Sequence, residues 1–494
     1  MRWPMLRKEI VSVLISEENK ILKEVNEFLI SEKRQRMLTG DRYYDGVQDI
    51  LLRARTVIGK NGKLEIVENL PNNKIVDNQY AKMVDQKTNY LVGKDISVDS
   101  ENEGYVKNLN DIFNKEFMRK MKFVTQDSYN FGIGWMFPQY DDLGKLTFRR
   151  YRSYEIDPHW EDVDHTILKY AYHVWFQKDD DDNLITYIEH FTQQGLYYYT
   201  VGSSGRLEPA EPYYQPYLYV DGKPFVWDRI PLIPFKSNAK EIPLICRVKS
   251  IQDGLNLIES NFQNSMEEDV RNTILVLKNY DGQNLAEFRK NLAEYGAVKV
   301  KTIDGSQGEV TALRIEVKAD NYKAIIDMFK KAIIENCKGF DAKDARLEGE
   351  PNQMNIESMY SDIDLDANNT ENEFQASFEK LLFFINSHLM NTGKGDFFDT
   401  EVKIIFNRDI LISESETIEN CVRSVGILPD ETIIANNPWV SDPASEFSKL
   451  QKQREEEMKE YEFGGGKLQQ GAGNSGGNNP SAAKSKKPDQ KSDK

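Results

Sequence analysis

The sequence predicts an α+β chain in which long amphipathic helices flank a strand-rich middle section. Apolar residues recur every three or four positions over residues 248–266, 322–337 and 356–389, which is the period of one helix face. Over residues 135–226 the period changes to two, which is typical of strands with one buried face. We therefore expect helices before and after an antiparallel sheet.

The N-terminal part is predicted to be mainly helical. Residues 1–40 are highly charged and carry an amphipathic stripe, and a turn is expected at 42–46. Further helices are predicted over 76–92 and 112–129 from the same apolar repeat. Residues 132–135 have the sequence Gly-Ile-Gly-Trp, which is expected to end the second of these helices and begin the first strand.

The middle section is predicted to be a set of hairpins. Aromatic and β-branched runs indicate strands at 146–148, 170–176, 184–188 and 196–199. Clusters of Asp, Asn and Gly punctuate these runs and are typical of hairpin turns. We expect one antiparallel sheet beside the N-terminal helices.

Two helices are predicted to lead to and from a small α/β insert. The insert, residues 271–318, is expected to contain strands at 274–277, 298–300 and 313–317 and a helix over 285–295. A charged loop follows Gly339, and the helix after it has roughly 35 residues, which is about 50 Å at 1.5 Å per residue. This order predicts a stalk with a tip.

The C-terminal part is predicted to hold short elements and a tail. A strand is expected at 402–406, and helices are expected over 413–425, 429–436 and 445–463. From Gly464 onward the chain is rich in Gly, Ser, Asn and Lys, a composition typical of disorder.

The order of these elements, with two local segments, resembles a known family. The segments are Ile-Pro-Leu-Ile-Pro-Phe-Lys-Ser-Asn at 230–238, before the first stalk helix, and Met-Tyr-Ser-Asp-Ile-Asp-Leu-Asp-Ala-Asn at 359–368. Over roughly residues 30–460 the chain resembles the portal protein, or head-to-tail connector, of tailed bacteriophages of the type found in phages of Gram-positive bacteria.

The resemblance implies a portal-like α+β fold with a wing, a two-helix stem, a small α/β clip, a long kinked helix and a mainly helical crown. The ranges that it implies are 1–40 for an N-terminal helical segment, 41–242 for the first part of the wing, 243–270 and 319–338 for the stem helices, 271–318 for the clip, 339–353 for a tunnel loop, 354–392 for the long wing helix, 393–463 for the crown and 464–494 for a disordered tail.

The resemblance also implies a structural function without catalysis or cofactors. Portal proteins form a ring, usually of twelve copies, at one capsid vertex, and double-stranded DNA passes through it during packaging and ejection. The expected partners are terminase, head-completion or adaptor proteins, and the major capsid and scaffolding proteins. The expected locations are the virion and, during assembly, the host cytoplasm.

The charge of the chain argues against tight binding to nucleic acid. The formal net charge of the 494 residues is −16, and residues 464–494 carry +4, so the remaining body carries −20. Few phosphate contacts are available to such a body, and weak, non-specific contact with sliding DNA is expected. No run of 18 apolar residues exists, so no membrane helix is expected. Three scattered cysteines fit a reducing compartment.

Three groups of residues are candidate functional sites. In the predicted tunnel loop they are Lys343, Arg346, Glu348 and Glu350, and on an acidic face of the long helix they are Asp362, Asp366 and Glu373. In the predicted clip, a docking surface would include Lys278, Asp281, Arg289 and Lys290. The loop charges are too mixed in sign for a fixed anion site, so each phosphate contact there is expected to be brief.

The acidic face allows alternative interpretations. Asp362, Asp364, Asp366 and Glu373 have the spacing of calcium-loop ligands, but Ala367 stands where that loop requires glycine. The face is therefore either a solvated stripe or a surface directed at the channel or a neighbouring subunit.

An enzyme acting on a polymer through the aromatic sheet at 135–226 is the alternative function. The sequence contains no GxxxxGK[ST], GxSxG or CxxC motif, and its five histidines lack metal-ligand spacing. His173 and His190 lie in strand-like runs, where we expect packed side chains rather than ligands. Ring formation would separate the two functions.

Overall fold

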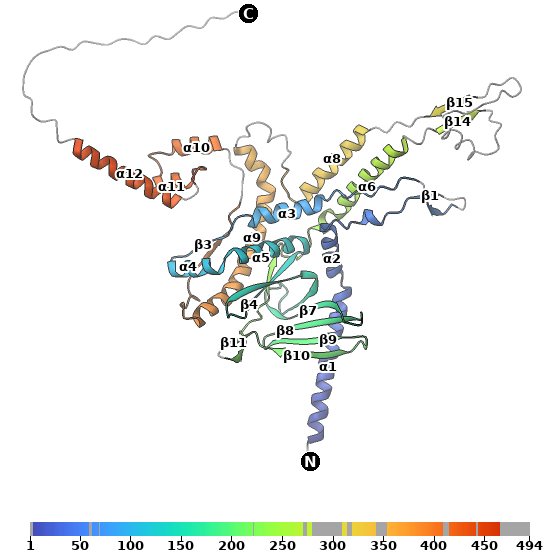
Figure 1. Ribbon diagram of the computed structural model, residues 1–494, viewed down its shortest axis with the longest axis horizontal. Coiled ribbons are helices and arrows are strands. Elements are labelled where there is room, and N and C mark those ends of the chain that lie inside the picture. The colour runs from blue at the N-terminus through green and yellow to red at the C-terminus, as the bar shows by residue number, and fades with distance from the viewer. Residues whose placement is uncertain are drawn as a thin grey trace, which may run out of the picture. The chain divides into compact units, whose positions relative to one another are not determined.

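The computed structural model describes residues 3–58, 62–68, 70–220, 222–269, 274–278, 309–313, 319–341, 353–408, 414–440 and 443–464 (Figure 1). The chain forms two compact units, Met1–Leu411 and Ile412–Lys494. Helices and antiparallel sheets are combined in the first unit, so the predicted α+β class is confirmed.

Five helices precede the two larger sheets of the first unit. They are α1 (Trp3–Ile30), α2 (Glu32–Tyr44), α3 (Gln79–Val92), α4 (Glu103–Ile112) and α5 (Lys115–Phe131), with the short 3₁₀ helix η1 at Asp49–Leu52. The predicted helix over 112–129 began in the wrong place, because Ile112 ends α4. The Asn114 side chain accepts hydrogen bonds from the backbone N–H groups of Glu116 and Phe117, and this N-cap starts α5 as a separate helix.

The middle section forms two larger sheets rather than the single predicted one. The five-stranded antiparallel sheet has the order β10-β9-β8-β7-β6, and the three-stranded sheet has the order β13-β4-β5. The strands of the first are β6 (Ile156–Trp160), β7 (Leu168–Lys178), β8 (Leu184–Thr192), β9 (Gly195–Val201) and β10 (Leu207–Gln215), and those of the second are β4 (Ile133–Tyr140), β5 (Leu146–Tyr151) and β13 (Ile233–Lys236). Residues 233–236 pair with β4 instead of simply leading into a helix.

Four two-stranded pairs and a second 3₁₀ helix complete the strand-containing part. The pairs are β1 (Thr56–Ile58) with β2 (Leu64–Ile66), β3 (Ser97–Asp99) with β16 (Lys403–Ile405), β11 (Leu218–Val220) with β12 (Lys223–Phe225), and β14 (Ile274–Lys278) with β15 (Glu309–Leu313); η2 covers Ser153–Glu155. The partner of β14 is residues 309–313, which share Leu313 with the predicted strand at 313–317. The rest of that predicted strand lies outside the described residues.

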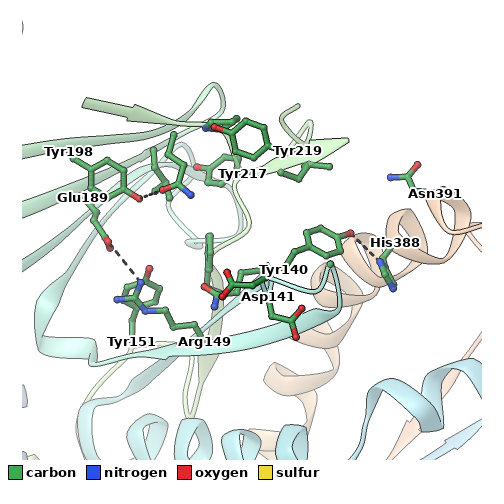
Figure 2. Close-up of a pocket in the computed structure, with 18 of the residues that line it drawn as sticks. Tyr140, Asp141, Arg149, Tyr151, Glu189, Tyr198, Tyr217, Tyr219, His388 and Asn391 are labelled. Atoms are coloured by element: carbon green, nitrogen blue, oxygen red, sulfur yellow. Dashed lines mark hydrogen bonds and ion pairs between the residues drawn. The ribbon is translucent and has the colours of Figure 1, made fainter. Parts of the chain in front are cut away.

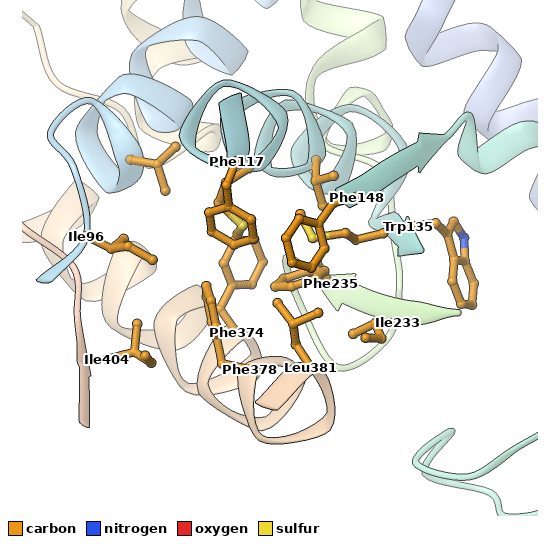
Figure 3. Close-up of a cluster of buried hydrophobic side chains, with 14 of the residues drawn as sticks. Ile96, Phe117, Trp135, Phe148, Ile233, Phe235, Phe374, Phe378, Leu381 and Ile404 are labelled. Carbon is orange, nitrogen blue, oxygen red and sulfur yellow. The ribbon is translucent and has the colours of Figure 1, made fainter. Parts of the chain in front are cut away.

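The main core lies where α5, the three-stranded sheet and the long helix α9 (Gln353–Asn391) meet (Figure 3). Phe117 and Phe148 pack edge to face with ring centroids 4.9 Å apart. On the same face of the sheet, Phe235 contacts Phe374 and Phe378, with centroids 5.2 and 5.7 Å apart. This aromatic cluster joins the N-terminal half of the unit to a helix that follows more than 200 residues later.

Two further helices, α6 (Ile245–Asp269) and α8 (Ala319–Asn336), lie side by side (Figure 1). Phe262 contacts Tyr322, with ring centroids 4.9 Å apart, and Gly254 faces the Phe329 ring. These two contacts pair later residues of one helix with earlier residues of the other, so the helices are antiparallel.

The first unit extends past the predicted beginning of the crown at residue 393. β16 pairs with β3, and Phe397, Ile404 and Phe406 belong to the main core. The second unit starts at Ile412 and contains α10 (Glu414–Arg423), α11 (Asp430–Ala435) and α12 (Pro443–Gly464). Within it Arg454 forms an ion pair with Asp430, at 2.5 Å. In the part of the chain that the structure describes, no helix has the length and apolar character of a membrane span.

Candidate functional site

The antiparallel pair α6/α8 is held to the rest of the first unit by a second hydrophobic cluster. Residues of α2, α3, α5, α6 and α8 contribute to it: Tyr43, Tyr80, Met83, Val84, Tyr129, Leu244, Ile245, Val248, Leu255, Ile333, Ile334 and Cys337. Within the helix pair, the buried residues of this cluster come from the first part of α6, up to Leu255, and from the last part of α8. Past Leu255 a different kind of contact takes over on α6.

A row of uncharged polar residues runs along one face of α6. Gln252, Asn256, Ser260 and Asn264 recur every fourth position, and none is more than 1% exposed. We call these four residues the polar row. Residues four apart lie on the same helix face, and a buried polar side chain requires a hydrogen-bond partner.

The partner of the polar row is the segment 71–78 between β2 and α3, which we call the strap. The backbone N–H of Asn73 donates to Asn264 Oδ1 at 2.8 Å, and that of Ile75 donates to Ser260 Oγ at 3.0 Å. The N–H of Asp77 donates to Asn256 Oδ1 at 3.1 Å. Alternate residues of the strap thus bind successive members of the row, and the strap runs antiparallel to α6.

The strap is also tied to α8 by charge. Lys330 Nζ lies 2.7 Å from Asp77 Oδ2 and 3.4 Å from Glu259 Oε1. Burial raises the pKa of Glu259, and the nearby Asp77 carboxylate adds to this effect. For Asp77 burial acts in the same direction, but the hydrogen bonds from Lys330 and Gln79 and the charge of Lys330 together outweigh it and lower the pKa. One ammonium group therefore connects the strap, α6 and α8.

The predicted acidic face of α9 is divided by the structure. Asp366 Oδ2 accepts a hydrogen bond from the buried Lys87 of α3 at 2.6 Å, and Lys338 lies 3.4 Å from its other oxygen. The Asp366 charge is thus neutralised within the subunit. Asp362 is exposed and Glu373 is half-buried, so these two carboxylates alone continue the face.

Of the remaining predicted site residues, the structure describes only Lys278. Outside the described residues lie Lys343, Arg346, Glu348 and Glu350 of the predicted tunnel loop and Asp281, Arg289 and Lys290 of the predicted clip. Lys278 ends β14, where its backbone pairs with Glu309. The predicted helix over 285–295, the predicted strand at 298–300 and the tail beyond Gly464 also lie outside the described residues.

The aromatic sheet does carry a cavity of about 660 Å³ (Figure 2). Its walls include Tyr151, Tyr198 and Tyr217, and its charged groups include Asp141, Arg149 and Glu189. Asp141 Oδ1 accepts hydrogen bonds from backbone N–H groups of its own turn. Glu189 is paired with Arg149 at 3.9 Å and with His173 at 2.8 Å. Asp141 and Glu189 are therefore both engaged in structural contacts within the subunit.

The histidines of the sheet are packed, as expected. His173 is 5% exposed and lies between Glu155 and Glu189. Burial lowers the pKa of His190 to about 4. In the described part of the chain no group of His, Cys, Asp or Glu side chains is arranged to hold a metal ion. In the calcium-like run of α9, Asp364 binds Arg408 at 2.5 Å while Asp366 binds Lys87.

Comparison with known proteins identifies the family. A family model described as "Phage portal protein, SPP1 Gp6-like" matches residues 30–460. The chain belongs to this portal family. The portal protein of Bacillus phage SPP1 is 28% identical over an alignment of 439 residues that covers 86% of this chain and 84% of that protein. The portal protein of Clostridium phage phiCD119 is 26% identical over an alignment of 426 residues that covers 83% of this chain and 90% of that protein.

Family membership confirms the resemblance seen in the sequence. Portal proteins are structural components of the virion rather than enzymes, so the alternative of an enzyme acting through the aromatic sheet is set aside. The polar row was not predicted from the sequence. The available signal was a stripe of amides and a hydroxyl at a spacing of four, free of charged residues on an otherwise charged helix.

Proposed function

We propose that this portal protein forms a closed ring at one capsid vertex, through which double-stranded DNA enters during packaging and leaves during ejection. The observation that carries the proposal is the antiparallel pair α6/α8 flanking residues 270–318, within a family match that spans 30–460. The ring has twelve subunits in this proposal. Such a ring is closed by heterologous contacts, in which different surfaces of neighbouring copies meet.

Each segment has a role in the proposal. Residues 243–270 and 319–338 form the stem around the channel, and residues 271–318 form a clip where terminase docks, and later head-completion or adaptor proteins. Lys278, Asp281, Arg289 and Lys290 contribute to that docking surface. The wing, formed by 41–242 and 354–392, and the crown, within 393–463, face the capsid and scaffolding proteins. Assembly takes place in the host cytoplasm.

The contact with DNA is weak in this proposal. The chain without residues 464–494 carries a net charge of −20, which repels phosphate, so only a few Lys and Arg side chains can contact the duplex. Lys343 and Arg346 of the loop 339–353 touch the backbone briefly, and Glu348 and Glu350 limit each contact. Asp362 and Glu373 face the channel or a neighbouring subunit.

Negative-stain electron microscopy of the purified chain tests the ring. We expect annular particles with a central hole wide enough for B-DNA. A stable, compact monomer in light scattering at micromolar concentration would contradict the proposal.

The double variant Lys343→Glu/Arg346→Glu tests the loop. We expect normal rings but less packaged or retained DNA per capsid. The control is Lys82→Glu/Lys107→Glu, which makes the same change of charge at two exposed helical positions. Full-length packaging with normal retention in the loop variant, or an equal loss in the control, would remove Lys343 and Arg346 from the mechanism.

A further inference from the structure

The two helices that flank the segment 342–352, α8 and α9, both contact the same helix, α3. On the side of α8, the Gln86 side chain binds both backbone groups of Phe340. Gln86 Oε1 accepts from the Phe340 N–H at 2.8 Å, and Gln86 Nε2 donates to the Phe340 carbonyl at 2.7 Å. A side-chain amide here pairs with the main chain as a neighbouring strand would.

The next residue of α3, Lys87, joins both sides of the segment. Its Nζ donates to the Cys337 carbonyl at 2.9 Å, at the end of α8, and to Asp366 Oδ2 at 2.6 Å, on α9. Lys87 is only 2% exposed. A buried ammonium group without its partners is costly, so both contacts must persist together for Lys87 to stay charged in this position.

The backbone between these contacts fits tightly against α3. Lys338 has a φ of +53°, and the Gly339 N–H donates to the Ile334 carbonyl at 2.8 Å, which closes the end of α8. A Cβ atom on Gly339 would lie 2.6 Å from Met83 Sδ and 2.9 Å from Gln86 Oε1. A side chain at this position would therefore displace the Met83 and Gln86 side chains, and with them the contact between Gln86 and Phe340.

On the far side of the segment, the aromatic rings of α9 complete the contact. The Phe340 ring stacks on the Tyr360 ring, with centroids 4.3 Å apart and an interplanar angle of 20°. Tyr360 also stacks on the Tyr90 ring of α3, with centroids 5.9 Å apart. Residues 337–340, 360 and 366 thus form one packed base against the last turns of α3.

We propose that Gln86, Lys87 and Tyr360 are positioning residues that clamp the base of the tunnel loop, so that α3 sets where the loop stands. The proposal rests on the proposed function in one respect, namely that this loop meets DNA. α3 contributes to both hydrophobic clusters, through Met83 in one and Leu91 in the other. A force on the loop is therefore transmitted to α3, whose N-terminal end is bound to α6 through the strap.

The test uses the assembled ring of the full chain. Gln86→Leu removes both hydrogen bonds to Phe340 at similar side-chain size, and Asn89→Leu makes a comparable amide-to-leucine change at an exposed position of the same helix. Hydrogen exchange of the peptide covering 337–341 is measured by mass spectrometry. We expect roughly tenfold faster exchange with Gln86→Leu, because the Phe340 N–H loses its acceptor, and no change with Asn89→Leu.

A second readout is packaged and retained DNA per capsid, which a purely structural contact would not alter in rings of normal appearance. We expect Gln86→Leu to lower it and Asn89→Leu to leave it unchanged. The pair Tyr360→Ala and Tyr360→Phe gives the same test without Gln86, because phenylalanine keeps the ring stacking and should restore both readouts. This pair decides the question if Gln86→Leu does not assemble.

The outcomes separate this inference from the proposed function. Unchanged hydrogen exchange in Gln86→Leu overturns the clamp. Faster exchange in Gln86→Leu with a normal amount of DNA per capsid overturns the positioning role. In that case, a loss of DNA in Lys343→Glu/Arg346→Glu would still support the proposed contact between the loop and DNA. A normal amount of DNA in that variant as well would refute the contact itself. Faster exchange, less DNA and restoration by Tyr360→Phe support the clamp.

Discussion

Replacing Asn256 with leucine removes the centre of the polar row while keeping the size of the side chain. Asn256 is fully buried, accepts from the Asp77 N–H at 3.1 Å and donates to Gln48 Oε1. Its Oδ1 also accepts from Gln252 at 3.0 Å, but Gln252 keeps a second partner, the Asp77 carbonyl at 2.6 Å. Two groups, the Asp77 N–H and Gln48 Oε1, therefore lose the bond that Asn256 makes to them.

The magnitude follows from these two groups. A buried polar group that loses its partner costs about 1–3 kcal/mol, so the pair costs about 2–6 kcal/mol. Leucine is a better helix former than asparagine by roughly 0.5 kcal/mol, which offsets part of the loss. We expect a net destabilisation of about 2–5 kcal/mol, or a fall in Tm of about 4–10 °C at the 2 °C per kcal/mol typical of units of this size.

The assay is thermal melting of the purified ring at fixed subunit concentration, followed by tryptophan fluorescence. Gln263→Leu is the matched control, because Gln263 is an exposed amide on the same helix. Its melting temperature should stay within about 2 °C of the parent, since exposed substitutions change stability little. A fall of less than 2 °C for Asn256→Leu, or an equal fall for the control, would refute the conclusion that the polar row fixes the strap.

Two other perturbations have defined outcomes. Gly132 has a φ of +86°, and a Cβ there would lie 2.3 Å from the Glu241 carbonyl oxygen. Gly132→Ala should therefore lower the free energy of unfolding, measured by thermal melting, by at least about 2 kcal/mol. The control Gly202→Ala, where no atom lies within 4 Å of the added Cβ, should melt like the parent. Burial would lower the pKa of His173, but hydrogen bonds with Glu155 and Glu189 outweigh it and raise the pKa. The stability from His173 is therefore complete below about pH 6.5 and lost as pH rises through the folded-state pKa. His173→Gln should flatten the decline of Tm above pH 6.5, and equal slopes in both proteins would contradict this assignment.

The helices could be predicted from the sequence because each buries one apolar stripe. The pattern over 356–389 contains Phe374 and Phe378, and both lie in the main core on α9. Boundaries set by single side chains were harder to predict. One helix ends at Ile112 and Asn114 caps the next two residues later, a change too short to disturb the apolar repeat that predicted one helix.

Polar contacts between distant segments could not be predicted. Asp366 shares a helix face with Asp362, but its partner Lys87 lies 279 residues away in the sequence. The polar row was equally hidden, because a polar stripe on a helix normally indicates solvent. The strap, which has no helix or strand of its own, covers those side chains together with Gln48 and makes them part of the interior.

The polar row also limits how long the strap can be. Four helical residues advance about 6.0 Å, whereas two extended residues advance about 6.7 Å, so the two spacings drift apart by roughly 0.7 Å per contact. From Asn264 to Asn256 the accumulated drift is about 1.4 Å, near the tolerance of a hydrogen bond. The fourth member is a longer side chain, Gln252, and it binds the Tyr80 N–H inside α3 rather than residue 79. Insertions within 73–77 would therefore break the match between the strap and the polar row. We expect changes of chain length in this region to be tolerated instead before the strap, in the part that contains β1 and β2.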